Sequence, residues 1–208
     1  MLKTVTPIDN SILVERKYAT DAEIDIALQN AYESRKKWKE TSLSERKEVV
    51  RNFVKSFLSN STEIVENLCK QIGRPISQCP GEMRGFEERA NYMIDNADRA
   101  LEDVVSRKDN EFDNYIKKEP LGTIFVIAPW NYPFNTSVNS IVPSLLSGNT
   151  VILKHSSQTP LCAEQLFDAA TKASMPKNIF QFLHLDHSST SKVISDHRIN
   201  HVLFTGSV

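Results

Sequence analysis

Residues 121–160 read LGTIFVIAPWNYPFNTSVNSIVPSLLSGNTVILKHSSQTP, and they divide into a strand, a helix and a second strand. Residues 124–128 are an unbroken apolar run without a polar face, which predicts a strand buried on both sides. The PWNYP segment ends this strand and places Pro133 at a favoured first helical position. Residues 151–153 are a second β-branched strand, so the stretch predicts a βαβ unit with a right-handed crossover.

The helix of this unit is indicated by apolar residues that recur every three or four positions. Gly148 follows the last of them and is typical of a C-terminal cap. The positions predicted to form the buried helix face are Phe134, Val138, Ile141, Val142 and Leu145.

Two polar residues follow the two strands: Asn131 the first and Lys154 the second. Ligands of such units bind beyond the carboxyl ends of the strands. There, an Asn amide can donate to a developing oxyanion, and a Lys can bind a ribose hydroxyl or a phosphate. Taken singly, each residue also fits a simpler interpretation, since Asn is common in proline turns and Lys is usually solvated.

Further βα units follow in the carboxyl-terminal part of the chain. Strands are predicted at residues 179–185 and 202–204, with a helix that begins at Thr159 and Pro160 and a short helix over residues 189–195. The strands recur at the interval of successive βα units. The predicted fold class is α/β, a Rossmann-like parallel sheet preceded by an amino-terminal helical layer.

The amino-terminal layer begins with an extended or hairpin segment at residues 4–18. Two capping boxes then open two helices, one at Thr20 and Glu23 and the other at Ser42 and Glu45. Their apolar positions follow helical spacing, and those of the first helix, which predict one common face, are Ile24, Leu28, Ala31 and Trp38.

A third helix is predicted over residues 61–72 and ends at Gly73. A fourth, longer helix carries an apolar stripe that predicts a buried face. Its members are Met83, Phe86, Ala90, Met93, Ala97, Leu101 and Val104. Residues 106–119 are charged and lack a helical face, which is typical of a solvated linker.

Composition excludes several classes of protein. The 208 residues include 25 Lys and Arg against 26 Asp and Glu, a net charge of −1, so nothing indicates a nucleic-acid or anionic-membrane partner. No apolar run is as long as a membrane span, and MLKTVTPIDN is not a signal peptide. Three cysteines without paired spacing fit a reducing compartment, so we expect a cytoplasmic protein.

Several motifs, taken together and in order, resemble the aldehyde dehydrogenase superfamily over nearly the whole chain. They are TDAEIDIALQNAYESRKKWKE, LSERKEVVRNFVKSFL, QIGRP, APWNYP, PSLLSGNTVILKHSSQTPL and FTGS. The resemblance implies NAD(P)-dependent oxidation of a small aldehyde to a carboxylic acid. In that chemistry a cysteine thiolate attacks the aldehyde, a hydride passes to the nicotinamide, and a glutamate activates the water that releases the acid.

The resemblance also implies residue roles. Asn131 matches the oxyanion donor, and Lys154 matches the lysine that holds the adenosine ribose. The other residues that match cofactor contacts are Ile127, Pro129, Trp130, Phe204, Gly206 and Ser207, the last at a helix amino terminus. The nucleophile and the base are expected beyond residue 208, so we expect the 208-residue chain alone to be inactive.

The domain organisation follows from the same resemblance. Residues 1–105 are the helical part of the cofactor domain, and residues 120–208 are the dinucleotide-binding βα units, which stop before the catalytic domain. Residues 106–119 match the start of arm strands that bridge subunits, and the family suggests a homodimer or tetramer. Two other functions stay open: a non-catalytic nucleotide- or subunit-binding module, and an incomplete gene product without activity.

Two departures from the family pattern concern the cofactor. An acidic residue often lies three positions after the lysine and accepts from both ribose hydroxyls. Ser157 stands there in this chain, which makes NADP acceptable beside NAD. The glycine-bearing turn after the third strand is replaced by HLDHSST at residues 184–190, and its bulkier side chains predict a narrower adenine site.

The cysteines and histidines give weaker signals. Cys162 lies in the first turn of a predicted helix on the ligand side of the sheet, where a helix amino terminus lowers a thiol pKa. It has no base nearby in sequence, Cys69 is explained as core filler, and Cys79 lies in a loop. The histidines fit no zinc pattern, so no metal site is predicted and surface or turn positions are expected for His184, His187, His197 and His201.

Overall fold

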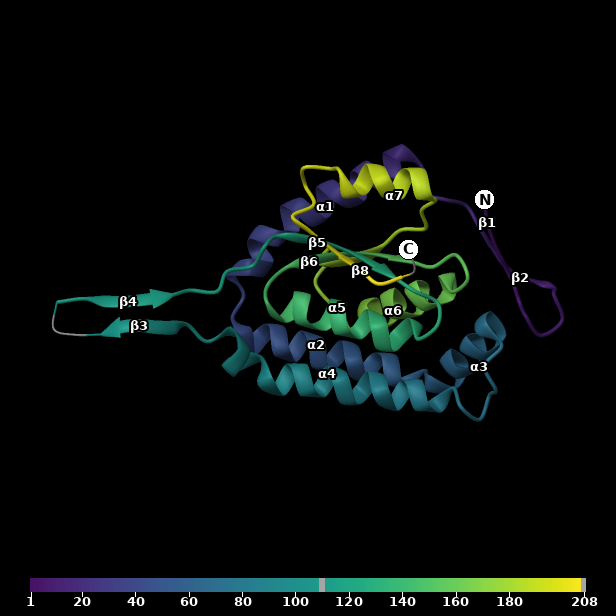
Figure 1. The fold of residues 1–208 in the computed structure, drawn as a ribbon, viewed down its shortest axis with the longest axis horizontal. Helices are drawn as coiled ribbons and strands as arrows, with labels where there is room; N and C mark the ends of the chain where they lie inside the picture. Colours follow the sequence, from purple (N-terminus) through teal and green to yellow (C-terminus); the bar gives the residue numbers. More distant parts are fainter. Residues whose placement is uncertain (109–110, 207–208) are drawn as a thin grey trace.

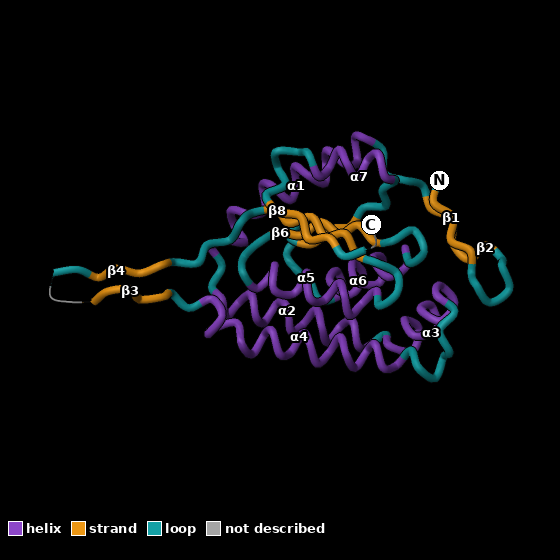
Figure 2. The backbone as a smooth tube through the Cα atoms, in the orientation of Figure 1, coloured by secondary structure: helices purple, strands orange, loops and turns teal. Residues whose placement is uncertain are grey.

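The computed structural model of the chain describes residues 1–108 and 111–206, in which a parallel sheet lies between two layers of helices (Figures 1 and 2). The strand order is β7-β6-β5-β8, and all neighbouring strands run parallel. The strands are β5 (Thr123–Ala128), β6 (Thr150–His155), β7 (Phe180–Phe182) and β8 (His201–Phe204). The predicted α/β class with a Rossmann-like parallel sheet is confirmed.

The central strand β5 is buried at all six positions, as its unbroken apolar run predicts. Helix α5 (Pro133–Leu146) connects it to β6, and α6 (Pro160–Lys172) connects β6 to β7. Gly148 has a φ of 84° just after α5, a left-handed conformation that a glycine adopts without steric cost. The predicted βαβ unit is therefore present.

The strand predicted at residues 179–185 is shorter than expected. β7 covers three residues, and the ladder ends after the Leu183 N–H donates to the Leu153 carbonyl at 2.9 Å. The next carbonyl, that of His184, accepts instead from the Ala19 N–H at 2.9 Å. Beyond Leu183 the backbone therefore bonds to the segment before α1 and no longer to β6.

Two helical layers cover the sheet. α1 (Asp21–Glu40) and α7 (His187–Ile194) cover one face, while α5 and α6 cover the other and pack on α2 (Leu43–Ser59) and α4 (Pro80–Leu101) (Figure 1). Aromatic rings join these last layers, since Phe57 lies 4.4 Å from Phe86 and 5.0 Å from Phe134 between ring centroids. Burial of these large side chains stabilises the packing between the layers.

The predicted helix ends are largely confirmed. Both capping boxes are present, at Thr20 with Glu23 and at Ser42 with Glu45. α3 (Ser61–Ile72) ends at a left-handed Gly73. Two details differ. Val104 belongs to the strand after α4, and Trp38 leaves the face shared by the other apolar residues of α1 and donates to the Leu145 carbonyl at 3.1 Å.

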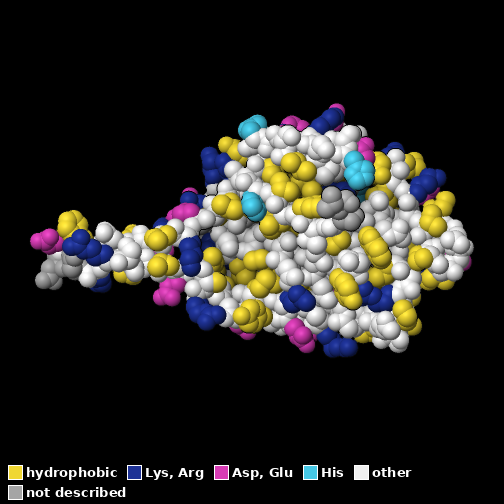
Figure 3. All heavy atoms as spheres, in the orientation of Figure 1, with side chains coloured by type: hydrophobic (Ala, Val, Ile, Leu, Met, Phe, Trp, Pro, Cys, Tyr) yellow, Lys and Arg dark blue, Asp and Glu magenta, His cyan; other side chains and the backbone are white. Residues whose placement is uncertain are grey.

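Two antiparallel hairpins lie outside the sheet. β1 (Leu2–Val5) pairs with β2 (Ile12–Arg16), in the region predicted to be extended. β3 (Val104–Lys108) pairs with β4 (Asp113–Ile116) and projects away from the molecule, with hydrophobic and charged side chains along it (Figures 1 and 3). In the part of the chain that is described, no helix combines the length and the apolar character needed to cross a membrane.

Candidate functional site

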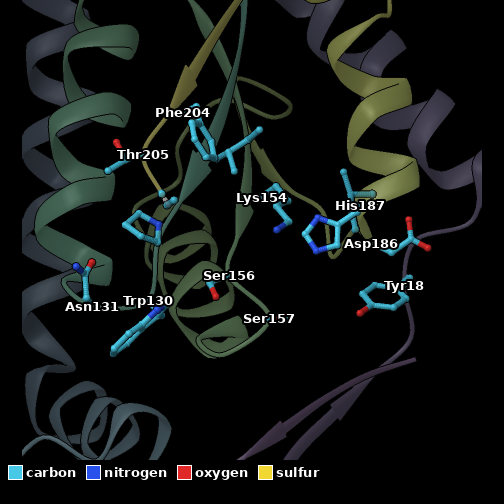
Figure 4. Close-up of a pocket in the computed structure, with 15 residues that line it drawn as sticks. Tyr18, Trp130, Asn131, Lys154, Ser156, Ser157, Asp186, His187, Phe204 and Thr205 are labelled. Atoms are coloured by element: carbon cyan, nitrogen blue, oxygen red, sulfur yellow. The ribbon is translucent and has the colours of Figure 1, made fainter. Parts of the chain in front are cut away.

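A pocket of about 530 Å³ lies at the carboxyl ends of β5, β6 and β8 (Figure 4). It is lined by Tyr18, Ile127, Ala128, Pro129, Trp130, Asn131, Lys154, Ser156, Ser157, Leu185, Asp186, His187, Phe204, Thr205 and Gly206. Every described residue that the sequence singled out for the oxyanion or the cofactor is in this set. Ser207, the remaining one, lies outside the described residues.

Some of the lining residues were not predicted from the sequence to belong to the site. Asp186 and His187 fall in the 184–190 turn, which stood out as a departure from the family pattern without a role for either residue. Tyr18 precedes α1 and lines the pocket, and the N–H of the next residue, Ala19, donates to the His184 carbonyl. No signal in the sequence indicates the position of Tyr18.

Lys154 is held at the end of β6 and partly removed from water. It is the ladder partner of Ile127 in β5, and Ile127 packs in the cluster between the sheet and α1. The Lys154 side chain therefore emerges toward the same helix layer. Burial lowers the pKa of its ammonium from the usual value, because desolvation disfavours the charged form. A bound anion would relieve that cost.

Asn131 lies in the exposed turn between β5 and α5. Its side-chain Oδ1 accepts from the Tyr132 N–H at 3.0 Å, which leaves the amide nitrogen as the donor end. Its backbone carbonyl accepts from Arg74 at 2.6 Å, and the Arg74 guanidinium lies 4.7 Å from the centre of the Tyr132 ring. Arg74, which lies outside the βαβ unit, therefore holds the turn that carries Asn131.

A buried carboxylate connects this turn to α4. Glu82 is 2% exposed, and its Oε2 pairs with Arg74 at 2.5 Å. Its Oε1 accepts from the Phe134 N–H at 2.8 Å, in the first turn of α5. A carboxylate at a helix amino terminus interacts favourably with the unsatisfied N–H groups there. The sequence predicted no role for Glu82, nor for Arg74, although Arg74 lies in the QIGRP motif.

The loop after Lys154 is also held by distant segments. The Thr4 hydroxyl donates to the Ser157 carbonyl at 2.8 Å, and the Gln158 amide donates to the Gln71 carbonyl at 2.6 Å. Because β1 and α3 both contact this loop, the amino-terminal hairpin contributes to the shape of the pocket. Thr159, at which the helix α6 was predicted to begin, makes no side-chain cap bond to that helix. Its hydroxyl lies 2.8 Å from Nδ1 of His155.

His155 is a buried neutral imidazole beneath the pocket. Its Nδ1 accepts from the Ser156 N–H at 3.0 Å, so the ring proton lies on Nε2, which faces the Pro133 carbonyl at 3.3 Å. Desolvation lowers the pKa of His155 to about 4. The ring therefore connects the carboxyl end of β6 to the start of α5. It is uncharged at neutral pH.

The expectation that a helix amino terminus lowers the pKa of the Cys162 thiol on the ligand side of the sheet is wrong. Cys162 is fully buried in the core formed by α6 and its neighbours, and its Sγ accepts from the Gln71 amide at 3.6 Å. Desolvation raises the pKa of the Cys162 thiol well above the usual value, and repulsion between the thiolate and Glu82 is the second cause of this increase. Burial therefore outweighs the helix amino terminus.

The histidines do not assemble into a metal site in the described part of the chain, where no group of three or more possible protein ligands occurs. His184 lies 2.9 Å from the Glu164 carboxylate, and Arg16 donates to both oxygens of that carboxylate at 2.8 and 2.9 Å. His197 is exposed, whereas His187 lines the pocket.

A Rossmann-like sheet with a pocket beyond its strand ends is typical of nucleotide-binding proteins. The chain belongs to the aldehyde dehydrogenase family, whose family model matches residues 1–208.

Two relatives and one solved structure illustrate the relationship. Succinate semialdehyde dehydrogenase (NAD(P)+) Sad of Escherichia coli (strain K12) is 29% identical over 205 residues, 99% of this chain and 44% of that protein. D-glyceraldehyde dehydrogenase (NADP(+)) of Picrophilus torridus is 27% identical, over 99% of this chain and 42% of that protein. Succinic semialdehyde dehydrogenase from Streptococcus pyogenes, solved in complex with NADP+, matches with a TM-score of 0.90 and 25% identity, over 97% of this chain and 44% of that chain.

The chain therefore spans less than half the length of these relatives. The family model covers residues 1–208, and the match to the solved structure covers 97% of the chain.

Proposed function

We propose that this chain provides the cofactor-binding part of an NAD(P)-dependent aldehyde dehydrogenase, which oxidises a small aldehyde to a carboxylic acid. The observation that carries the proposal is the pocket that gathers Asn131, Lys154 and Phe204 from three separate strand ends. A nicotinamide cofactor, when bound, would supply the hydride acceptor. The chain's own contribution is to bind and orient its adenosine end and to stabilise charge at the aldehyde oxygen.

The pocket residues fit an adenine dinucleotide in their chemistry. Lys154 offers a half-buried ammonium for ribose or phosphate oxygens, and Ser157 lines the same pocket. Ile127 and Phe204 offer apolar surfaces for the adenine. The main acidic group in the lining, Asp186, is occupied by its own helix cap, as its Oδ1 accepts from the Ser189 N–H at 2.8 Å.

Asn131 is proposed as the oxyanion donor. Its Oδ1 is already accepting from the Tyr132 N–H, which orients the amide nitrogen as the donor. Preorganised donors of this kind stabilise charge that develops in the transition state and typically contribute about 3–4 kcal/mol. The Arg74–Glu82 pair supports this role by holding the backbone of the turn.

We also propose that the chain by itself does not oxidise aldehydes. The covalent route needs a thiolate, yet Cys79 and Cys162 are buried and desolvation raises the pKa of both. Cys69 is half-buried on α3 and does not line the pocket. The thiols of this chain are therefore unsuited to the role of nucleophile.

The cofactor role is tested by calorimetric titration of the chain with ADP, which carries the adenosine end without the nicotinamide. Lys154→Met should weaken ADP binding at least about tenfold, since a hydrogen bond to a charged group contributes roughly 1.5–3 kcal/mol. Lys177→Met is the matched control, because Lys177 lies between α6 and β7, away from the pocket. Equal affinities for Lys154→Met and the unaltered chain would contradict the proposal.

A subunit-binding role is favoured by the β3–β4 hairpin. Val105 and Tyr115, which are ladder partners, are 64% and 59% exposed. Exposed apolar side chains on a projecting hairpin are typical of a protein interface. We propose that a second copy of the chain covers them. Val105→Lys/Tyr115→Lys should lower the mass measured by light scattering, whereas Ile26→Lys, on the exposed face of α1, should not.

A further inference from the structure

The 184–190 turn places a histidine at the edge of the proposed cofactor pocket. His187 is the first residue of α7, and it lines the same cavity as Lys154 and Ser157. Figure 4 shows the nitrogen-bearing ends of His187 and Lys154 turned toward each other across the pocket. The two side chains come from separate elements, the start of a helix and the end of a strand.

The charges around these two residues favour an anion. Desolvation lowers the pKa of Lys154, and in the described part of the chain no ion pair with a carboxylate is found for its ammonium. Asp186 carries the one carboxylate among the described residues of the lining, and its Oδ1 accepts from the Ser189 N–H at 2.8 Å and the Ser188 hydroxyl at 3.0 Å. Its charge is thereby engaged with the start of α7.

The same cap occupies one of the N–H groups at the start of α7. Asp186 uses the Ser189 N–H, one of the first N–H groups of α7. Side chains of the lining supply further donors to a ligand. Among the side-chain donors of the lining are the Lys154 ammonium, the Ser157 hydroxyl and a His187 ring N–H.

Resting on the proposed cofactor role, we propose that His187 is a specificity-determining residue that donates, together with Lys154, to a 2′-phosphate on the adenosine ribose. A phosphate monoester offers three acceptor oxygens, which suits a set of donors arriving from different elements. A plain 2′-hydroxyl accepts from Lys154 alone and leaves His187 unused. His187 therefore adds affinity for NADP and little for NAD.

The experiment compares 2′,5′-ADP with ADP, which differ by the 2′-phosphate and lack the nicotinamide. The dissociation constants for both compounds are measured by calorimetry on the whole chain. His187→Ala should weaken 2′,5′-ADP binding about tenfold and leave ADP binding within about twofold. His187→Gln retains an N–H donor and should lose less than about threefold. His197→Ala, at a histidine whose side chain is 86% exposed and outside the pocket, is the matched control.

The outcomes separate the two proposals. If ADP binds and His187→Ala weakens both compounds equally, or neither, the specificity role of His187 is overturned while the cofactor role stands. If neither compound binds to the unaltered chain, both proposals fail. If His197→Ala reproduces the effect of His187→Ala, the loss is unrelated to the pocket and the specificity role is again overturned.

Discussion

The Arg74 guanidinium donates a hydrogen bond to the Asn131 carbonyl across 2.6 Å, although the two residues are 57 positions apart in the chain. The second terminal nitrogen of the Arg74 guanidinium pairs at 2.5 Å with the buried Glu82 carboxylate. The turn that carries the proposed oxyanion donor is therefore fixed by a side chain from the loop before α4. Its geometry depends on the packing of α4 against α5, as well as on the proline turn.

Arg74→Met should destabilise the chain by about 3 kcal/mol, because it leaves the Glu82 carboxylate buried without its cation. The free energy of unfolding in urea measures this. Arg84→Met, on an exposed position of α4, should change that free energy by less than about 0.5 kcal/mol. Similar values for both variants would show that the Glu82 charge is compensated by the α5 amino terminus alone.

Stability should fall as the pH is lowered through the range set by His155. Its pKa is about 4 in the folded chain and about 6.5 when unfolded, so the unfolded state binds the proton first. The contribution of the neutral His155 imidazole to the free energy of unfolding is fully present above pH 6.5, and it is lost as the pH falls toward 4. Between pH 7 and pH 5 the loss should be about 2 kcal/mol.

Urea unfolding at both pH values checks this expectation, with His155→Gln as the variant. The drop in unfolding free energy between pH 7 and pH 5 should be smaller in His155→Gln by that amount, whereas His197→Gln, at an exposed histidine, should match the unaltered chain. An unchanged drop in His155→Gln would mean that the imidazole is protonated in the folded state.

Ser157→Glu should shift cofactor choice toward NAD. A carboxylate there accepts from both ribose hydroxyls and repels a 2′-phosphate, whereas serine does neither. The ratio of the dissociation constants for 2′,5′-ADP and ADP should rise at least about tenfold, or roughly 1.4 kcal/mol. A constant ratio would mean that the Ser157 side chain does not face the ribose, although its backbone is anchored by Thr4.

Thiol reactivity should separate the three cysteines. Cys69 is half-buried, whereas Cys79 and Cys162 are buried, so an aromatic disulfide reagent should modify Cys69 first in the folded chain. All three should react in urea. Cys69→Ser should remove the early phase and leave the slow ones. Rapid modification of Cys162 in the native chain would contradict the burial that we assign to its thiol and would reopen its candidacy as a nucleophile.

Much of the architecture follows from the order of residues. The apolar run of β5, the proline at the start of α5 and the capping boxes act within a few residues, so local spacing determines them. The same holds for Asn131 and Lys154, because the ends of parallel strands meet at one edge of a sheet. Those positions could be predicted without knowing which helices cover the sheet.

The tertiary structure alone decided the environments of individual side chains. Cys162 stands at a helix start in sequence, yet desolvation from surrounding helices raises its pKa. His155 and the Arg74–Glu82 pair join segments far apart in the chain, and His187 reaches the pocket because α7 folds back over the sheet. Burial and charge compensation depend on neighbours from every layer, and the distances among those neighbours are set only when the core packs.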